Sequence, residues 1–207
     1  MKLILVRHGE TVLNRQRRVL GRGDFPLTEL GRLQAQAAGR ALGRHRPSAL
    51  YSSPVARAME TARIIGRIRG LEVVPLPGMA EADAGDLEGL TGEEFRRRFP
   101  DFVRRWSQDP ATARMPGGET LQEVQERAWR AVMELEEAHP GETVAVVSHY
   151  MVTSAFLCRL LGVPLRWFDR LRQDVGAIAT VRMDGDGGAL LSLNDTCHLR
   201  GLEEGPG

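Results

Sequence analysis

The chain has 207 residues, of which 42% are hydrophobic and 27% charged, and its formal net charge is +1. This length and composition predict one globular domain, residues 1–207, with a single well-buried core. A balanced charge provides no concentrated basic field, so we expect neither nucleic acid nor a membrane surface as a partner.

The contents of lysine and cysteine exclude several kinds of site. Lys2 is the only lysine among the 28 basic residues, so a Walker-type phosphate loop is absent and arginine must bind any anion. Cys158 and Cys197 form no CxxC pair, which argues against a zinc or redox site and favours two buried free thiols. These residues suggest neither a zinc site nor a redox motif. The protein as a whole is expected to use no metal and no cofactor.

The sequence predicts no targeting signal. The apolar run after Met1 is too short for a signal peptide, and no later stretch approaches a membrane-spanning length. We therefore expect a cytoplasmic protein.

Three short apolar runs predict buried strands. They cover residues 3–6, 49–52 and 143–147, and each precedes a plausible helix start. Strands alternating with helices are typical of a parallel sheet. The expected fold class is a three-layer α/β/α sandwich with a mostly parallel central sheet and an antiparallel edge strand.

Helix and turn signals support this architecture. Residues 27–29 open an amphipathic helix, the pair Ser53-Pro54 predicts a cap and first turn, and residues 120–123 form a capping box. Residues 177–183 and 190–193 flank a glycine-rich segment at 184–188, which predicts a β-hairpin. We expect residues 203–207 to be a frayed terminus.

A helical cap insertion is expected at about residues 85–118. Aromatic and apolar residues recur there at helical spacing with arginines between them, and Pro100 interrupts the pattern. The default interpretation is an amphipathic helix pair packed on the core with a solvated charged face. The alternative is a lid whose arginines, between Arg96 and Arg105, contact an acidic substrate.

Candidate catalytic residues follow the predicted strands. Arg7 and His8 come after the first strand, Arg57 lies in the first turn of the helix opened by Ser53-Pro54, and His149 follows the strand at 143–147. Parallel strands present their carboxyl ends at one edge of a sheet, where helix N-termini favour an anion. A neutral imidazole there could attack a phosphoryl group whose charge the guanidinium groups hold.

The ordered set of motifs resembles the histidine phosphatase superfamily, in its phosphoglycerate mutase-like branch. The matching residues run from the first strand to the last candidate histidine: Arg7-His8-Gly9-Glu10-Thr11, Asn14, Arg18, Gly21, residues 24–31, Ser52-Ser53-Pro54, Arg57, Glu81, residues 85–89, residues 116–119 and Ser148-His149.

The resemblance implies a phosphoglycerate mutase-like fold and a covalent mechanism. His8 would be the nucleophile, with Arg7, Arg57 and His149 around the phosphoryl oxygens. Glu81 would protonate the leaving group and then activate water. We expect phosphate to raise the pKa of this carboxyl, because like charges disfavour ionisation. The residues alone do not choose among the nearby carboxylates, and only the family pattern selects Glu81.

Three further residues are expected to bind phosphate or substrate, namely Asn14, Gly21 and Tyr150. Tyr150 departs from the family, which commonly has a small residue after the second histidine. A bulky side chain there either narrows the pocket or contributes a hydroxyl. For Arg18, in a basic loop, we expect a structural role.

The departures from the mutase pattern favour hydrolysis. Mutases of the family typically have a tyrosine where this chain has Ala84, and a lysine downstream, whereas this chain has no lysine after Lys2. The expected function is hydrolysis of a small phosphorylated substrate. A phosphoglycerate mutase, a non-catalytic phospho-ligand binder and a homodimer are left open.

Overall fold

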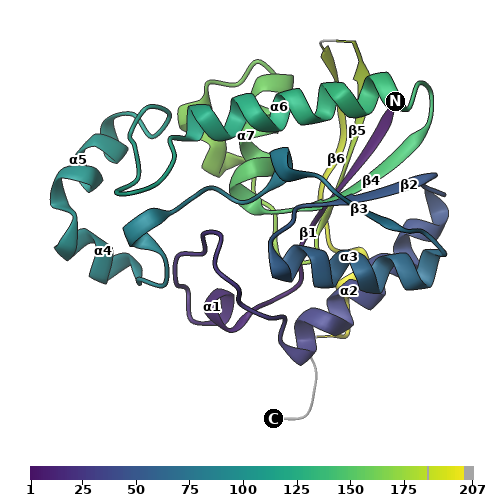
Figure 1. Cartoon of the computed structure of the whole chain (residues 1–207), viewed down its shortest axis with the longest axis horizontal. Helices are drawn as coiled ribbons and strands as arrows, with labels where there is room; N and C mark the ends of the chain where they lie inside the picture. Colours follow the sequence, from purple (N-terminus) through teal and green to yellow (C-terminus); the bar gives the residue numbers. More distant parts are fainter. Residues whose placement is uncertain (186, 203–207) are drawn as a thin grey trace.

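A six-stranded sheet is the centre of the molecule within residues 1–185 and 187–202, the part described by the computed structural model (Figure 1). Its strands are β1 Lys2–Arg7, β2 Ala49–Ser52, β3 Val73–Pro75, β4 Thr143–Ser148, β5 Ile178–Asp184 and β6 Gly187–Asp195. The helices are α1 Val12–Arg15, α2 Glu29–Ala41, α3 Ala56–Arg69, α4 Gly92–Arg98, α5 Pro100–Gln108, α6 Leu121–Ala138 and α7 Tyr150–Leu160.

The sheet is mostly parallel, as expected. The strand order is β3-β2-β4-β1-β5-β6, in which the first four run parallel and β5 is antiparallel to both its neighbours. The antiparallel strand lies one place in from the edge, because β6 pairs on its outer side. β5 and β6 confirm the predicted hairpin, while Asp186 in its turn and the terminus at 203–207 lie outside the described residues.

Helices cover both faces of the sheet. Side chains alternate along β1, so Leu3 and Leu5 join the core beneath α6 and α7, whereas Ile4 and Val6 join the core beneath α2 and α3. All four are at most 1% exposed, as expected for a central parallel strand buried on both faces. The three-layer sandwich is therefore confirmed.

Two of the three predicted helix starts are confirmed. The side chain of Thr28 caps α2, and Thr120 opens the capping box of α6. The prediction for Ser53-Pro54 is wrong, because the N-cap of α3 is Val55, which makes no side-chain cap bond. The Ser53 hydroxyl accepts a hydrogen bond from the Val55 N–H at 3.2 Å and faces the candidate site instead.

The aromatic segment after residue 90 forms the two helices α4 and α5, which are joined at Pro100. Phe102 is buried in the core beside α6, so the apolar face packs inward. The arginines of both helices are exposed. This arrangement agrees with the default interpretation of a solvated charged face, and the assignment of 85–118 as a cap over the site stays a prediction.

Two other features are the lack of a membrane-spanning helix in the described residues and the exposure of the two cysteines. In the described part of the chain, no helix combines the length and apolarity needed to cross a bilayer. Cys158 is buried as expected, but Cys197 is exposed, because it lies in a short 3-10 turn after β6. The expectation of two buried thiols was wrong for Cys197.

Candidate active site

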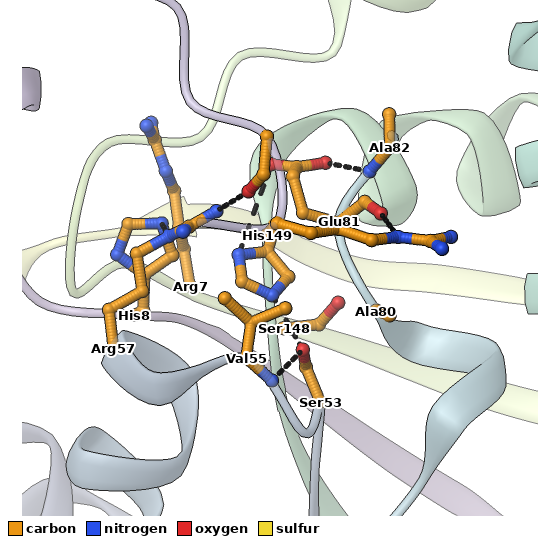
Figure 2. A network of polar contacts seen from close by, with 12 residues as sticks. Arg7, His8, Ser53, Val55, Arg57, Ala80, Glu81, Ala82, Ser148 and His149 are labelled. Carbon is orange, nitrogen blue, oxygen red and sulfur yellow. Dashed lines mark hydrogen bonds and ion pairs between the residues drawn. The ribbon is translucent and has the colours of Figure 1, made fainter. Parts of the chain in front are cut away.

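Four predicted residues converge at the carboxyl edge of the sheet (Figure 2). Arg7 ends β1 and His8 follows it, His149 follows β4, and Arg57 lies in the first turn of α3. The ring centroids of His8 and His149 are 5.1 Å apart, and Arg57 Nε lies 3.2 Å from His8 Nε2. Distant segments thus place two imidazoles and the Arg57 guanidinium in one cluster, and Arg7 precedes His8 at the same edge of the sheet.

The protonation state of His8 is fixed by its neighbours. Its Nδ1 lies 2.7 Å from the carbonyl oxygen of Gly9, and since a carbonyl only accepts, Nδ1 carries the proton and Nε2 keeps its lone pair. Burial lowers the pKa of His8 well below its usual range, and the charges of Arg57 and Arg7 lower it further. His8 is therefore a neutral imidazole with an available nucleophilic nitrogen.

The glycine after His8 is required by packing. A Cβ at Gly9 would lie 2.2 Å from the carbonyl oxygen of Gly31, in the first turn of α2. The close approach of these two backbones fixes the loop that carries His8 against α2.

Backbone carbonyl groups orient the two guanidinium groups. Arg57 is fully buried and donates to the carbonyl oxygens of Gly21 at 2.8 Å and Gly23 at 3.4 Å. Arg7 donates to the carbonyl oxygen of Gln173 at 2.6 Å. Burial lowers the pKa of both arginines, but a guanidinium remains protonated at neutral pH. Both groups can therefore bind a dianion through planar, fixed donors.

Glu81 faces His149 across the cluster. Its Oε2 lies 3.9 Å from His149 Nδ1, and its Oε1 accepts from the N–H of Ala82 at 2.8 Å. Burial raises the pKa of Glu81, although Arg57 opposes this effect. Burial also lowers the pKa of His149, whose Nε2 lies 2.7 Å from the Ser53 hydroxyl. The arrangement favours a protonated carboxyl next to a neutral imidazole.

The geometry distinguishes Glu81 from nearby carboxylates that the residues alone left equivalent. Asp83 accepts from the N–H of Gly85 at 3.0 Å. Glu88 accepts from the N–H groups of Gly21 and Gly23 at 3.0 and 2.8 Å. Both therefore organise local backbone, whereas Glu81 points at the imidazole cluster.

Asn14 lies at the edge of a cavity that Arg7 also lines. Its Oδ1 accepts from the N–H and the hydroxyl of Thr11 at 3.0 and 2.9 Å, which caps α1. Asn14 and Arg7 line a cavity of about 610 Å³ that extends to Arg172 and Arg200. Neither imidazole lines it, because His8 and His149 are at most 1% exposed.

Gly21 and Tyr150 also lie next to the predicted phosphate-binding arginines. Gly21 donates its N–H to Glu88 and accepts from Arg57, so both of its backbone groups are engaged. The Tyr150 ring centroid lies 5.5 Å from Arg7 Cζ, and its hydroxyl donates to the carbonyl oxygen of Asp169 at 3.3 Å. Tyr150 therefore packs beside Arg7, and its effect on a substrate pocket stays a prediction.

Other residues have roles outside the cluster. Arg18 donates to the Gly89 carbonyl oxygen and pairs with Glu94, so its predicted structural role agrees with the geometry. The three remaining histidines contact groups elsewhere: His45 with Lys2, His139 with Tyr51, and His198 with the carbonyl oxygen of Gly176. Over the described ranges, no group of three or more His, Cys, Asp or Glu side chains could hold a metal ion.

Two polar residues at the site were not identified from the sequence. The sequence predicts a helix cap at Ser53, whereas the Ser53 hydroxyl contacts His149. Arg127, in the middle of α6, donates to the carbonyl oxygen of Glu81 at 3.0 Å. Neither role has a local signal, because each depends on a contact between segments far apart in the chain.

Comparison with known proteins agrees with this geometry. The family model of the histidine phosphatase superfamily (branch 1) matches residues 3–196. The chain is 36% identical to phosphoserine phosphatase 1 of Hydrogenobacter thermophilus over 199 residues, which covers 96% of this chain and 94% of that protein.

Solved structures show the same similarity. Bacillus stearothermophilus YhfR superposes with a TM-score of 0.89 at 32% identity, covering 96% of this chain and 98% of that one. A mycobacterial glucosyl-3-phosphoglycerate phosphatase in complex with VO3 superposes with a TM-score of 0.84 at 31% identity, covering 93% and 98% of the two chains. This chain belongs to the histidine phosphatase superfamily, branch 1.

Proposed function

We propose that this protein hydrolyses small phosphomonoesters through a phosphohistidine formed at His8. The observation that carries the proposal is the neutral His8 imidazole, whose Nε2 lies 3.2 Å from Arg57 and whose ring lies 5.1 Å from that of His149. A phosphate monoester is a dianion, so attack on it requires fixed cations that do not compete as nucleophiles. Arg7 and Arg57 meet this requirement.

In the first step, His8 Nε2 attacks phosphorus and the bond from phosphorus to the leaving oxygen breaks. Arg7, Arg57 and His149 hold the three equatorial oxygens. Glu81 transfers its proton to the departing alkoxide, which leaves as an alcohol. Burial raises the pKa of Glu81, which favours the protonated form that this step needs.

In the second step, water replaces the alcohol. The Glu81 carboxylate accepts a proton from this water, whose oxygen attacks the phosphohistidine. The bond from phosphorus to His8 breaks, inorganic phosphate leaves, and both residues return to their starting states. The proposed cycle uses side chains of this chain alone.

The proposed substrates are small phosphorylated metabolites. The relatives are named for phosphoserine and glucosyl-3-phosphoglycerate, and another similar structure is named an α-ribazole phosphatase. Phosphoserine, a sugar phosphate, 3-phosphoglycerate and α-ribazole phosphate therefore form the first panel. Exchange between 3- and 2-phosphoglycerate distinguishes the alternative, a mutase, for which Ala84 and the lack of any lysine after Lys2 are unfavourable.

The test traps the phosphoenzyme by rapidly quenching a reaction with substrate that carries a radiolabelled phosphoryl group. The stability of the protein-bound label is then measured in acid and in base. We expect acid-labile, base-stable label on the wild type and none on His8→Asn, which preserves much of the shape of the side chain. Hydrolysis by His8→Asn should fall at least about 1000-fold, because the nucleophile is lost. Unchanged hydrolysis by His8→Asn would reject the proposal.

A further inference from the structure

Arg127 makes a dense set of contacts with the segment that carries Glu81. From the middle of α6 it donates to the carbonyl oxygens of Gly78 at 2.8 Å, Ala80 at 2.6 Å and Glu81 at 3.0 Å. Its Nε and one terminal nitrogen also donate to the two carboxylate oxygens of Glu119, each at 3.0 Å. One guanidinium thus makes five hydrogen bonds around the proposed acid.

Glu119 extends this connection to the other side of Glu81. Its Oε2 accepts from the N–H of Asp83 at 2.9 Å, and its own N–H donates to the carbonyl oxygen of Asp83 at 2.9 Å. Residues on both sides of Glu81 are therefore bound to the same Arg127–Glu119 pair. The backbone of Glu81 has few remaining ways to move.

The backbone around Glu81 is also closely packed against α6 and its preceding loop. A Cβ at Gly78 would lie 2.5 Å from Ala131 Cβ, and a Cβ at Gly118 would lie 2.1 Å from the carbonyl oxygen of Asp83. Arg127 and Glu119 have side-chain exposures of 19% and 20%. Their bidentate pair is therefore partly shielded from water, which strengthens hydrogen bonds of this kind.

Arg22 joins the pair to the loop that orients Arg57. It donates to the carbonyl oxygen of Glu81 at 3.0 Å and lies 3.1 Å from Glu119 Oε1. Its neighbours Gly21 and Gly23 accept from Arg57. The pair thus connects the carboxyl that serves the leaving group with the loop that holds the phosphate-binding arginine.

We propose that Arg127 and Glu119 are positioning residues that fix Glu81 where the leaving oxygen departs. This inference rests on the proposed function, because it assumes that Glu81 is the general acid. Neither residue touches the phosphoryl group in the proposed cycle. The two residues act by holding the Glu81 carboxyl in position. Misplacement of such a group by about 1 Å costs on the order of 100-fold in rate.

A positioning role predicts that the loss depends on the leaving group. Alkyl phosphates release a basic alkoxide that needs a proton in the transition state, whereas 4-nitrophenyl phosphate releases a weakly basic phenolate that does not. A displaced Glu81 should therefore slow the first class far more than the second. Partial unfolding or a damaged phosphate pocket would slow both classes equally.

The test compares kcat/KM for phosphoserine and 4-nitrophenyl phosphate in Arg127→Lys and Glu119→Gln. Lysine keeps the charge but cannot reproduce the five bonds of the fork. We expect kcat/KM to fall about 100-fold for phosphoserine and less than about fivefold for 4-nitrophenyl phosphate. Arg130→Lys, at an exposed position of the same helix, is the matched control and should leave both values unchanged.

The ratio of the two values does not depend on the folded fraction, because both are measured on one preparation. Equal losses on the two substrates, or no loss, would overturn the positioning role. The proposed function has a separate readout, since its failure would appear as wild-type enzyme without phosphohistidine. If neither phosphoserine nor another alkyl phosphate of the panel is hydrolysed by the wild type, the proposed function fails first.

Discussion

The phosphate side and the leaving-group side of the site are built in different ways. On the phosphate side, Arg7, His8 and His149 follow directly from the ends of β1 and β4, so the sheet itself brings them together. On the leaving-group side, Glu81 lies on a segment outside any strand or helix and is held by contacts from Arg127. Topology places the first group, whereas long-range hydrogen bonds place the second.

The two sides also differ in electrostatics. On the phosphate side, burial and neighbouring cations keep the histidines neutral and leave a positive field from the arginines. On the leaving-group side, burial favours the proton on Glu81. The comparison predicts that variants of the two sides differ in substrate dependence and in pH dependence.

Among the variants that compare the two sides of the site, Arg57→Lys should have the largest effect. The ammonium cannot donate to His8, Gly21 and a phosphoryl oxygen from one plane, so kcat/KM should fall about 1000-fold. The loss should be the same for alkyl and aryl phosphates, because both share the phosphoryl group. Arg63→Lys, at an exposed position of α3, is the control. A loss confined to alkyl phosphates would break the division between the two sides.

In the Glu81→Gln variant, kcat/KM for alkyl phosphates should fall about 100-fold to 1000-fold relative to the wild type. The fall in kcat/KM for 4-nitrophenyl phosphate should be much smaller. Because the acid must be protonated, wild-type activity on alkyl phosphates should fall as pH rises through the raised pKa of Glu81. Glutamine does not titrate, so this alkaline decline should disappear from the pH profile. Asp83→Asn should retain it, and a profile unchanged by Glu81→Gln would assign the proton to another group.

The two sides of the site should contribute to the pH dependence of stability in opposite directions. His8 and His149 have lowered pKa values in the folded state, so their contribution is present above about pH 6.5 and is lost as pH falls. Glu81 has a raised pKa, so its contribution is present at low pH and is lost as pH rises through that value.

Urea unfolding at pH 7.5 and 5.5 measures these contributions. Each histidine accounts for at most about 1.36 kcal/mol per pH unit of lost stability on acidification. When the pH falls from 7.5 to 5.5, the free energy of unfolding should decrease more for Glu81→Gln than for the wild type, because the variant lacks the contribution that a protonated Glu81 makes. It should decrease less for His149→Asn, because that variant lacks one of the two histidines. The opposite order would contradict the assigned directions.

The smallest effect is expected from the charged face of α4 and α5. Arg97 and Arg105 are exposed, and changing both to serine should alter kcat/KM by less than about twofold at physiological salt, where exposed charges are screened. A tenfold rise in KM for an acidic substrate would instead support the lid interpretation of residues 85–118.

The sequence predicted the parts of the molecule that local patterns encode. Buried apolar runs indicated β1, β2 and β4, and capping residues indicated α2 and α6. Strand β3 was missed, because Val73–Pro75 has only three residues, mostly exposed, and ends in proline. Periodicity over so short a stretch carries little information.

In the candidate site, the residues placed by strand topology could be predicted from the sequence, whereas those placed by long-range contacts could not. The convergence of His8, Arg57 and His149 follows from parallel strands that share one edge. Glu81 was selected by family resemblance alone, because its distinction from Glu88 depends on burial and on contacts with His149. The role of Arg127 depends on how α6 packs beside residues 78–81, which no local pattern shows.

The most direct test of the central claim is a crystal structure with orthovanadate. The account predicts vanadium bonded to His8 Nε2, with its oxygens contacted by Arg7, Arg57 and His149, and with the Glu81 carboxyl at the oxygen opposite His8. Vanadate bound only in the cavity beside Arg172 and Arg200, away from His8, would contradict it.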